Sequence, residues 1–572
     1  MKEPMCGIDL GTTNSCIAYL KDGKSVPIEI EDGLAIVPSV VSLDEATGHI
    51  FVGKQAKNRL MAFPGATVRS IKRQMGKEIK VSIGAKSFSP EEISSFILKY
   101  LVDKASAKLG QDIKKVVITV PAYFNDAQRR ATISAGELAG LEVLRIINEP
   151  TAASLVYDYV SFIEKVESPY IMVYDLGGGT FDVSILEIKG EIKEVLASCG
   201  DTALGGDDFD ERLVAYFLAQ IRRKTGLELS DTNLPWHIRL KEIAEKTKIA
   251  LSDSPYVTVQ EVAVAIVNGE PVNLDIEVSR KEYEEMISDL VDKTIVKVNE
   301  AISEAHLSID AIGEVLLVGG ATRTPLIQER LSEIFKRPIY HSVDPDLCVG
   351  LGAAVQNGLI AGEDVGHILL DVTAHSLGVK TADDFCETTG EANYFSTIIR
   401  RNTKIPVRKS DVYFTMVDEQ EVVRVEVYQG ESQSCKENSR VGKFIFELKP
   451  APADSPVITE FAYDKEGLVH ITVEQKGYNN KKTVTLNVRS KEIVDRQGKE
   501  EKQEILNYIL QKARRLMKDE KLPANLRKEI ELLGNDYEDA LRSGGDKMID
   551  DLEDNLLNKI EKAEERLTED NE

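Results

Sequence analysis

The sequence predicts a multidomain protein in which an α/β domain is followed by an antiparallel β domain and then by a short helical segment. Three observations support this prediction. Apolar strand-like runs alternate with helical patterns up to about residue 364, apolar and polar residues alternate from about 376 to 490, and only helical periodicity remains after that. A chain of 572 residues is also too long to fold around a single core.

The first region contains continuous apolar runs that are typical of buried strands, such as residues 114–120, 170–176 and 314–320. Between such runs, apolar residues recur every three or four positions, for example over 278–305 and 325–335, which predicts helices. This alternation favours sheets that are covered by helices on both faces. The region is long enough for two such units, so we expect two lobes.

The segment that joins the first two regions, residues 365–375, is apolar. It contains Ile368, Leu369 and Leu370 in succession, followed by Val372. Linkers between domains are usually polar and solvated. We therefore expect this segment to dock on a neighbouring domain.

The second region, residues 376–490, predicts an antiparallel β domain. Apolar and polar residues alternate over 422–428, 467–475 and 482–488, and turn-forming residues lie between runs, as at 477–480. Alternation of this kind is typical of strands with one buried face and one solvated face.

The last region, residues 491–572, has no strand pattern. Pro523 and Gly544-Gly545 divide it into about three helices. A solvated helical bundle is the simplest interpretation, with an apolar stripe at steps of three and four residues. The stripe consists of Ile549, Leu552, Leu556, Ile560, Ala563 and Leu567.

The composition excludes several classes of function. A formal charge of −24 argues against a protein that holds nucleic acid or anionic lipid by bulk attraction. The six cysteines form no CxxC pair, which favours reduced thiols in a cytoplasmic protein. No basic-then-apolar leader and no run of about 18 apolar residues is present, so we expect neither export nor a membrane span.

Two similar phrases occur far apart: GIDLGTTN at 7–14 and YDLGGGTFDV at 174–183. Each follows a strand pattern and precedes another, which predicts a hairpin with a turn of small residues. Successive N–H groups in such a turn can bind an anion. One copy alone would be interpreted as an ordinary glycine hairpin. Two copies predict a pair of turns that face each other and hold one polyphosphate between them.

Other residues near these turns fit the same chemistry. Asp9 and Asp175 each end a strand beside a turn, where a carboxylate can hold the water shell of Mg²⁺. A third glycine turn at 318–325 follows a strand and opens a helix at Pro325. The chain contains no GxxxxGK[ST] stretch, which excludes a P-loop enzyme.

Six stretches, in order, carry a resemblance to a known family: GIDLGTTNS (7–15), VPAYFNDAQR (120–129), INEPTAA (147–153), DLGGGTFDVS (175–184), LGGDDFD (204–210) and VGGATRTP (318–325). They resemble the ATPase domain of the heat shock protein 70 family of DnaK-like chaperones. The later stretches 393–407 and 427–431 are similar in particular to the short HscC-type bacterial branch of that family.

The resemblance implies a domain organisation. Residues 1–364 would form an actin-like, two-lobed ATPase domain, and residues 365–375 the linker. Residues 376–490 would form a β-sandwich that binds peptides, and residues 491–572 an α-helical lid.

The resemblance also implies catalytic roles. Asp9, Asp175 and Asp182 would surround Mg²⁺, mainly through its waters. Lys72 would lie near the γ-phosphate, and Glu149 would orient the attacking water. Thr180 is also implied to be a catalytic residue. The phosphate hairpins would comprise Gly11, Thr12, Thr13, Asn14, Gly177, Gly178, Gly179 and Thr180.

ATP and ADP with Mg²⁺ are the implied ligands, and K⁺ is left open as a further ion. Glu245, Lys248 and Ser252 are spaced to share one helix face, as a common ligand requires, although surface ion pairs use the same spacing. The implied nucleoside contacts are Gly205, Gly206, Asp207, Glu245, Lys248, Ser252, Gly319, Gly320, Arg323 and Asp346.

The resemblance also implies a peptide groove, although alternating apolar residues on strands are mostly core. Its members would be Leu377, Val379, Thr381, Ala382, Tyr413, Met416, Val423, Val425 and Leu468. Coupling between the domains would involve Pro121, Arg129, Leu369, Leu370 and Asp371.

The sequence departs from the family at several positions. Residues 374–375 read Ala-His where the family places Pro and an apolar residue, and Asp207 stands where Glu is commoner. An acidic insertion occupies 383–393. The catalytic stretches are intact, so hydrolysis is expected, while the peptide preference and the strength of the interdomain coupling stay open.

The resemblance implies an ATP-dependent chaperone that binds and releases extended apolar segments of unfolded proteins. Its partners would be a J-domain co-chaperone and, left open, a nucleotide-exchange factor. Two alternatives remain: an ATP-switched clamp for one dedicated client, and a non-chaperone ATPase or kinase of the actin-like fold. The apolar linker and the β domain argue against the last one.

Overall fold

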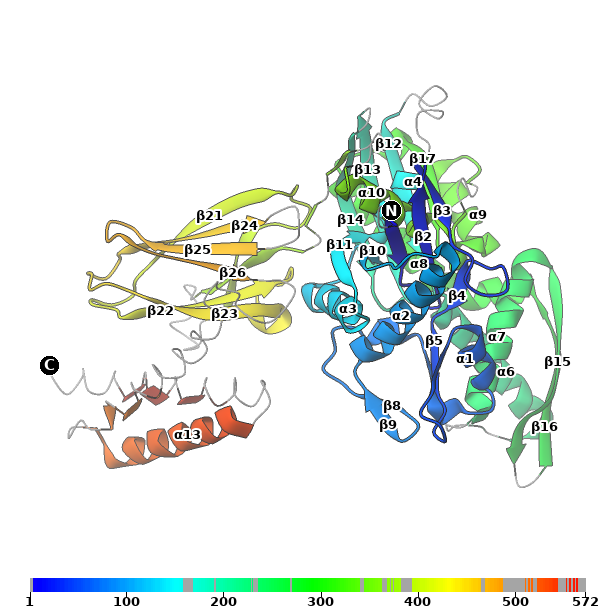
Figure 1. Cartoon of the computed structure of the whole chain (residues 1–572), viewed down its shortest axis with the longest axis horizontal. Helices are drawn as coiled ribbons and strands as arrows, with labels where there is room; N and C mark the ends of the chain where they lie inside the picture. The colour runs from blue at the N-terminus through cyan, green and yellow to red at the C-terminus, as the bar shows by residue number, and fades with distance from the viewer. Residues whose placement is uncertain are drawn as a thin grey trace.

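The computed structural model describes most of the chain (Figure 1). The predicted residues Asp371, Ala382 and Leu468 and the insertion at 383–392 lie outside the described residues, as do the side chains of Leu369 and Leu370. The described residues are 4–157, 168–189, 192–227, 229, 235–267, 270–339, 344–362, 368–370, 372–373, 375–381, 393–463, 469–486, 510, 513–514, 516–517, 522–543, 552, 555–556, 559–560 and 562–563.

Six strands form the N-terminal sheet: β1 (Cys6–Asp9), β2 (Asn14–Lys21), β3 (Lys24–Pro27), β4 (Ile36–Pro38), β10 (Lys115–Val120) and β11 (Glu142–Asn148). Their order is β11-β10-β1-β2-β3, with β4 also paired to β2. The strands β11, β10 and β1 run parallel, whereas β2 is antiparallel to its neighbours. All residues of β10 after the first are buried, as its apolar run predicts.

Five strands form the second sheet: β12 (Tyr170–Leu176), β13 (Phe181–Lys189), β14 (Ile192–Asp201), β17 (Ile312–Val318) and β18 (Ile368–Leu370). Their order is β17-β12-β13-β14-β18. The strands β12, β13 and β14 are antiparallel, while β17 and β18 run parallel to their neighbours. The edge strand β18 consists of residues from the apolar linker.

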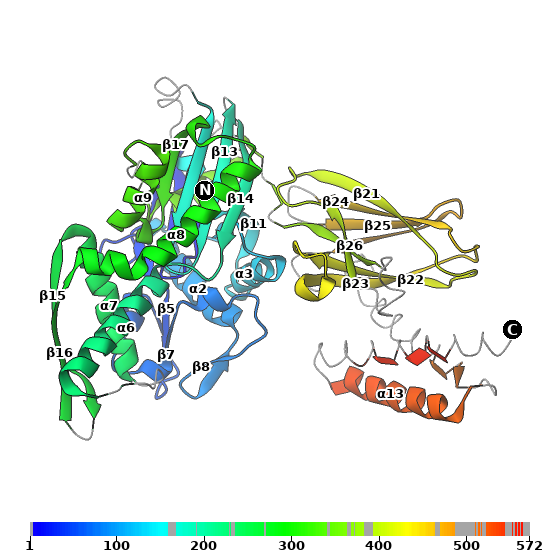
Figure 2. The ribbon, with the colours of Figure 1, turned by 180° about the vertical axis from the view of Figure 1, so that it is seen from behind.

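Helices cover both sheets (Figures 1 and 2). The predicted helices 278–305 and 325–335 are confirmed as α8 (Arg280–Glu304) and α9 (Pro325–Phe335). The other helices of this part are α1 (Lys54–Arg59), α2 (Pro90–Leu109), α3 (Asp126–Leu138), α4 (Glu149–Val156), α6 (Gly206–Thr225), α7 (Pro235–Asp253) and α10 (Cys348–Ile360).

Local sequence signals explain where α2 begins and ends. Ser89 accepts a hydrogen bond from the backbone N–H of Glu92, and the Glu92 carboxylate accepts one from the N–H of Ser89. Pro90 occupies the first turn, where its missing N–H costs nothing. The helix ends at Gly110, which adopts a φ of 66°.

Smaller strands complete this part of the molecule. A three-stranded sheet has the order β6-β5-β7, and two hairpins pair β8 with β9 and β15 with β16. These strands are β5 (Val40–Leu43), β6 (Ile50–Val52), β7 (Thr67–Arg69), β8 (Val81–Ile83), β9 (Lys86–Phe88), β15 (Tyr256–Val267) and β16 (Glu270–Ser279).

Three apolar clusters hold these elements together. The first lies between the N-terminal sheet, the β5 sheet and α2, and the second between the second sheet, the β15 hairpin and helices α6 to α9. A third cluster joins the two sheets through Val117 of β10, Val173 of β12, Ala152 of α4 and Ala353 of α10. The first two clusters are therefore distinct cores, and the third one joins the two sheets.

Eight further strands form two antiparallel sheets, ordered β20-β19-β22-β23 and β21-β24-β25-β26. Both contribute side chains to one shared core, such as Val427 from the first sheet and Phe461 from the second. This confirms the predicted antiparallel pairing. The strands are β19 (Leu377–Thr381), β20 (Tyr394–Ile399), β21 (Val407–Phe414), β22 (Val422–Gln429), β23 (Ser439–Glu447), β24 (Pro456–Tyr463), β25 (Val469–Gln475) and β26 (Asn480–Leu486).

The described end of the chain is helical. Helix α13 (Ala524–Ser543) begins directly after Pro523, and its Ile530 and Tyr537 pack in a cluster with Leu556 and Ile560. The described members of the apolar stripe therefore pack against α13, while Ile549 and Leu567 lie outside the described residues. Figure 1 shows α13 apart from the two larger parts. None of the helices described has the length and apolarity that crossing a membrane requires.

Candidate functional site

Two turns of small residues face each other between the two sheets. The strands β1 and β2 pair around the first turn, and β12 and β13 pair around the second. A Cβ added to Gly178 would lie 1.8 Å from Oγ1 of Thr13, and one added to Gly179 would lie 2.6 Å from Cγ2 of Thr12. The two turns are therefore in direct contact, as the duplicated phrase predicts.

The N-terminus of α6 packs against the second turn. The backbone N–H of Gly206 donates to the carbonyl of Gly177 at 3.0 Å, and that of Asp207 donates to the carbonyl of Gly178 at 2.7 Å. A Cβ added to Gly205 would lie 2.6 Å from the carbonyl carbon of Gly178. Only glycine permits this approach, so the LGGDDFD stretch holds the turn in place.

Three carboxylates lie beside the turns. Asp9 ends β1, and Asp175 pairs with Asp182 across β12 and β13. Burial and the charge of Glu149 raise the pKa of all three, that of Asp9 to about 7. Thr119 donates a hydrogen bond to Asp9 at 3.0 Å. The site thus concentrates negative charge that burial makes costly to keep ionised.

Lys72 and Glu149 form a buried ion pair, with 2.5 Å between Nζ and Oε1. The ammonium also lies 5.7 Å from the ring centre of Phe124. Lys72 belongs to a 3₁₀ turn, Ile71–Gln74, on the side of the N-terminal sheet, while Glu149 begins α4. Each side chain compensates the other, because an unpaired charge at this depth is destabilising.

The donor set fits Mg²⁺. Hard cations prefer carboxylate oxygens and water, and Mg²⁺ retains several of its waters. Asp9, Asp175 and Asp182 offer only carboxylate oxygens, and burial, with the charge of Glu149, raises their pKa values, so a nearby cation would stabilise their ionised forms. The residues present therefore suit a magnesium ion beside bound phosphates.

A cavity of about 750 Å³ opens between the turns and α7, a size that suits a small ligand. Glu245, Lys248 and Ser252 line it from one face of α7. Lys248 contacts Asp210 at 2.8 Å and donates to the carbonyl of Gly206 at 3.1 Å. The other predicted residues that line it are Asp9, Gly11, Thr12, Thr13, Asn14, Lys72, Glu149, Asp175, Gly177, Gly178, Thr180, Gly206, Gly319, Gly320, Arg323 and Asp346.

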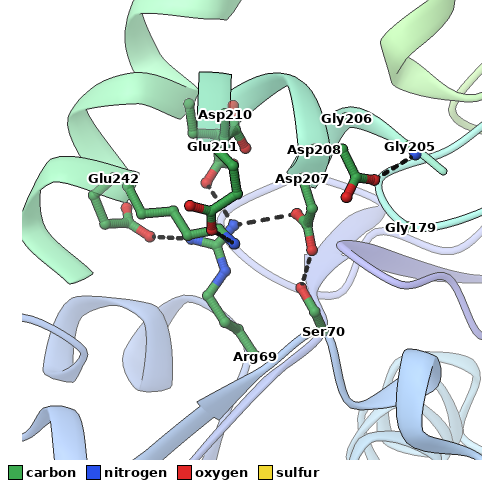
Figure 3. Close-up of polar contacts among 12 residues, drawn as sticks. Arg69, Ser70, Gly179, Gly205, Gly206, Asp207, Asp208, Asp210, Glu211 and Glu242 are labelled. Carbon is green, nitrogen blue, oxygen red and sulfur yellow. Dashed lines mark hydrogen bonds and ion pairs between the residues drawn. The ribbon is translucent and has the colours of Figure 1, made fainter. Parts of the chain in front are cut away.

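Four predicted nucleotide-site residues do not line the cavity. Asp182 is turned toward the N–H of Tyr123, which donates to it at 2.9 Å. The carboxylate of Asp207 is turned toward Arg69 and Ser70 (Figure 3). The remaining two, Gly179 and Gly205, are covered by the close approaches of neighbouring turns.

The sequence did not indicate every lining residue. Ile249 of α7 also lines the cavity and exposes 58% of its surface, so the cavity has an apolar wall beside Lys248. The sequence signal that could have identified Ile249 was its position directly after Lys248. Asp253, Gln328, Pro345 and Val349 line the cavity too.

Comparison with known proteins agrees with this geometry. The family model described as Hsp70 protein matches residues 5–83 and 77–572. This chain belongs to the Hsp70 family. The chaperone protein DnaK of Thermotoga neapolitana is 40% identical over 581 residues, covering 99% of this chain and 93% of the relative. Those of Thermotoga petrophila and Thermotoga maritima are each 41% identical over 575 residues, covering 98% of this chain and 92% of each relative.

As a member of the Hsp70 family, the protein is an ATP-dependent molecular chaperone and an ATPase. The matches extend over nearly the whole chain, so they include the β sheets as well as the nucleotide site. The two alternatives, a clamp for one dedicated client and a non-chaperone ATPase or kinase of the actin-like fold, are not favoured. The comparisons do not distinguish the HscC-type branch within the family.

The residues predicted for the peptide groove of this Hsp70 protein are spread over different environments. Leu377, Val379 and Val425 are buried in the core that the two β sheets share. Tyr413 and Val423 pack against that core and stay partly exposed, and Thr381 ends β19. Met416, by contrast, exposes 77% of its surface. In this structure Leu377, Val379 and Val425 expose almost no surface that a peptide could contact. The peptide groove therefore stays a prediction.

An exposed apolar row lies at the edge strand β21 and the loop after it. Val412, Phe414, Met416 and Val417 expose between 45% and 77% of their surfaces. The strand β21 pairs only with β24 within its sheet, so one edge is unpaired among the described strands. Of these four residues, only Met416 was among the predicted groove residues. The alternation of apolar residues at 412, 414 and 416 was a sequence signal for Val412 and Phe414 as well.

The predicted coupling residues connect the nucleotide site to the surface near α3. Arg129 donates to Oδ1 of Asn148 at 2.7 Å and to the carbonyl of Ala122 at 2.8 Å. Asn148 directly precedes Glu149, and Pro121 is buried at the end of β10. Arg129 therefore ties the loop after β10 to the residue beside Glu149.

The linker and the β sheets contact the second sheet. Residues of β18 pair with β14, from Ile192 opposite Ile368 to Glu194 opposite Leu370. Close by, Arg401 forms ion pairs with Glu300 and Glu304 of α8. Docking of the apolar linker, which the sequence predicts, is thus observed along the β18 edge.

Further polar contacts join the same two parts. The amide of Asn402 donates to Glu304 at 2.8 Å, and its oxygen accepts from the N–H of Ser198 at 3.3 Å. His375 packs edge-on against Tyr123, with 4.9 Å between ring centres. Sequence reasoning did not single out these contacts as a group, because they join residues far apart in the chain.

Proposed function

We propose that this Hsp70 protein hydrolyses Mg-ATP in the cavity that the two facing turns and α7 line, and uses the cycle to bind and release extended apolar segments of unfolded proteins. The direct contact between the Thr12-Thr13 turn and the Gly178-Gly179 turn carries the proposal. Facing rows of backbone N–H groups at such turns suit a polyphosphate held from two sides.

The phosphate chain would lie in the cavity against both turns, and the nucleoside would extend toward α7. Glu245, Lys248 and Ser252 provide polar groups on that helix, and Ile249 provides an apolar surface for a base. Arg323 and Asp346, which pair at 2.6 Å, border the same side of the cavity. This arrangement supports a purine nucleotide over a bare phosphate.

Hydrolysis proceeds by positioning and electrostatics. Water attacks the γ-phosphorus, the bond to the β,γ-bridging oxygen breaks, and ADP and inorganic phosphate leave. The Lys72 ammonium offsets charge on the γ-phosphate, and the Glu149 carboxylate accepts a hydrogen bond from the attacking water and orients it. Their mutual contact of 2.5 Å keeps both groups at the turns before the nucleotide arrives.

Asp9 and Asp175, which line the cavity, would hold Mg²⁺ beside the phosphates, mainly through its waters. Asp182, whose carboxylate accepts the N–H of Tyr123, would contribute its charge from behind them. When bound, Mg²⁺ neutralises phosphate charge and orients the chain. Thr180 lies buried in the second turn and lines the cavity, where its hydroxyl can donate to a phosphate oxygen. K⁺ is a further candidate ligand on the resemblance alone.

We assign the two large sheets with their helices to two lobes of an actin-like ATPase domain over residues 1–364. The linker is assigned to 365–375, a β-sandwich that binds peptide to 376–490, and a helical lid to 491–572. The separate cores of the two sheets and the core shared by the eight later strands support these boundaries.

Peptide binding is assigned to the exposed end of the β sheets that carries β21. An extended segment would place apolar side chains against Phe414 and Met416, which are exposed in the structure. The predicted groove residues Leu377, Val379 and Val425 would support this surface from beneath. Unfolded polypeptides and a J-domain co-chaperone are the proposed partners.

The proposed location is the cytoplasm. Cys6, Cys16, Cys199, Cys348 and Cys435 are free and buried, which suits a reducing compartment. This placement follows the resemblance to DnaK chaperones.

Single-turnover ATP hydrolysis, measured with and without an unfolded peptide, tests the proposal. We expect slow hydrolysis that accelerates with an unfolded peptide and further with a J-domain protein. Hydrolysis that no peptide and no J-domain protein accelerates would overturn the chaperone cycle. Binding of a single motif on a peptide array, instead of many apolar segments, would favour a clamp for one dedicated client.

A further inference from the structure

The loop after β10, residues 121–124, reaches the nucleotide site from behind. The backbone N–H of Tyr123 donates to Oδ1 of Asp182 at 2.9 Å. The ring centre of Phe124 lies 5.7 Å from the Lys72 ammonium. A shift of this loop would therefore displace one of the three buried carboxylates and change the surroundings of Lys72.

Tyr123 and Asp182 also pack against the same residue of β14. A Cβ added to Gly200 would lie 2.9 Å from Cβ of Tyr123 and 2.7 Å from Oδ1 of Asp182. Only glycine permits this approach, so the loop and the carboxylate fit closely against one stretch of backbone. A displacement of Tyr123 reaches Asp182 by packing as well as through the hydrogen bond.

Three consecutive carbonyl groups of this loop are held by side chains. Arg129 donates from Nη2 to the carbonyl of Ala122 at 2.8 Å and from Nε to that of Phe124 at 3.0 Å. The carbonyl between them, that of Tyr123, lies 3.3 Å from Nε2 of His375. Nε2 donates this bond, because a carbonyl oxygen can only accept. Two of the three carbonyls are thus held from α3, and the middle one is held from beyond the linker.

His375 is anchored in the part of the molecule that the eight later strands form. It lies two residues before β19, and its neighbour Ser376 donates to Glu431 from its backbone N–H at 2.9 Å and from its hydroxyl at 2.8 Å. The His375 ring packs edge-on against Tyr123, with 4.9 Å between ring centres. Its backbone therefore follows the β sheets, while its ring follows the loop. Figure 2 shows α3 and β14 on the side of the nucleotide part that faces these sheets.

The contact coincides with a departure from the family pattern. Residues 374–375 read Ala-His, where the Hsp70 family places Pro and an apolar residue. An apolar side chain could pack against Tyr123 but could not donate to its carbonyl. The hydrogen bond therefore depends on this departure.

We propose that His375 is a positioning residue for ATP hydrolysis: while the linker is docked, its bond to the Tyr123 carbonyl fixes the loop behind the nucleotide site. The loop in turn holds Asp182 and borders Lys72. His375 touches neither nucleotide nor metal and acts through Tyr123. When β18 separates from β14, the middle carbonyl loses its donor, whereas Arg129 keeps the other two. The chemical step then slows, because the groups around the phosphates are no longer held in one position.

The inference rests on the proposed nucleotide site, and its test separates the two. Single-turnover hydrolysis of prebound Mg-ATP is measured for the full chain and for two variants. His375→Leu keeps a side chain of similar size without a donor, and His375→Gln has an amide that can still donate. We expect hydrolysis to slow about fivefold in His375→Leu and to stay within about twofold in His375→Gln, with the affinity for ATP unchanged in both.

The outcomes that contradict the two proposals differ. Absence of hydrolysis in the unmodified chain would overturn the proposed function, and this inference with it. Equal rates in the unmodified chain and in a folded His375→Leu would overturn this inference alone. Slowing in His375→Gln equal to that in His375→Leu would show that the donated hydrogen bond is not the cause, and would also contradict the inference.

Hydrogen exchange provides a readout that does not depend on activity. Exchange of the Tyr123 amide is followed in the full chain without nucleotide or magnesium. We expect it to be about fivefold faster in His375→Leu and unchanged in His375→Gln, because the loop opens more often when its middle carbonyl has no donor. Amides of α2 serve as the internal reference. Equal acceleration there would mean a general loss of stability and would contradict a role of His375 in the loop.

Two further variants test whether the effect belongs to His375. His49→Leu is the matched control, since His49 also packs edge-on against a ring, that of Phe51 at 4.6 Å, but is exposed. Asn402→Ala removes a docking contact, the hydrogen bond of 2.8 Å to Glu304, and leaves the His375 bond in place. We expect neither variant to change hydrolysis by more than about twofold. Slowing equal to that of His375→Leu in either one would assign the effect to another cause and contradict the inference.

Discussion

The nucleotide cavity and the predicted peptide groove differ in how their residues converge. Residues from distant stretches, such as Asp9, Lys72, Glu149 and Asp175, line one cavity. The predicted groove residues do not share one surface: Leu377 is buried in a core, whereas Met416 is among the most exposed apolar residues described. Polar residues that share a ligand constrain one another, while apolar alternation is common to cores and grooves.

The largest expected effect is on the nucleotide side of this comparison. Asp175→Asn removes one negative charge beside the phosphates but keeps the side chain's size. We expect nucleotide binding to persist and hydrolysis to slow by roughly a hundredfold or more, measured as phosphate release in a single turnover. Asp32→Asn, on an exposed residue, is the control. Normal turnover of Asp175→Asn would mean that the magnesium assignment is wrong.

The buried ion pair gives a second large effect. Lys72→Met leaves Glu149 buried without its partner, so we expect a loss of about 3 kcal/mol in the free energy of unfolding, together with strongly reduced hydrolysis. The double variant Lys72→Met, Glu149→Gln is expected to recover most of the stability but none of the activity. Denaturant unfolding and phosphate release measure the two effects. Recovered hydrolysis in the double variant would contradict the catalytic roles.

A pair of variants sharpens the comparison on the peptide side. Leu377→Ala, in the shared core, is expected to cost about 2–5 kcal/mol in the free energy of unfolding. Met416→Ser, on an exposed residue, is expected to leave stability unchanged and to weaken binding of an apolar peptide about fivefold. Fluorescence anisotropy of a labelled peptide measures the affinity. Unchanged affinity in Met416→Ser and in Phe414→Ser would move the peptide surface away from β21.

The smallest expected effect depends on pH. Burial lowers the pKa of His375 below its ordinary value of 6.5, and Arg129 acts in the same direction, while Glu431 and the carbonyl of Tyr123 oppose it. Docking of His375 on Tyr123 therefore favours the neutral ring, so its contribution is present above about pH 6.5 and is lost as the pH falls. Protection of β18 from hydrogen exchange should be a few-fold weaker at about pH 5.5.

His375→Gln provides the control for that prediction. It keeps a polar side chain of similar size but cannot titrate in this range. We expect the pH dependence of β18 protection to disappear in this variant, since Tyr123 then faces a group of constant charge. A pH dependence that persists would show that His375 is not its source.

Much of the fold was predictable from the sequence because local patterns determine it. The apolar run at 114–120, the periodicity at 278–305 and the duplicated turns each specify a local structure that the chain adopts. The position of the two turns opposite each other was also predictable, because two turns that bind one shared ligand must lie close together. These features depend on residues near one another in sequence or on shared chemistry.

What the sequence did not predict depends on packing between distant elements. Arg69 looks like a surface residue until the fold brings Glu242 within 3.0 Å. Asp207 falls in a nucleotide motif, yet its carboxylate turns to Arg69 and Ser70 instead of the cavity. The edge position of β21, which exposes Phe414, likewise follows only from the strand order.

We expect the binding of Mg-ATP at the two turns to change the affinity of the peptide surface through the docked linker. The most direct test follows the release of a labelled apolar peptide after Mg-ATP is mixed with the preformed complex. We expect ATP to accelerate release about tenfold, and ADP to leave it unchanged. If ATP binds but the peptide leaves at the same rate as with ADP, the two sites are not coupled and the account is contradicted.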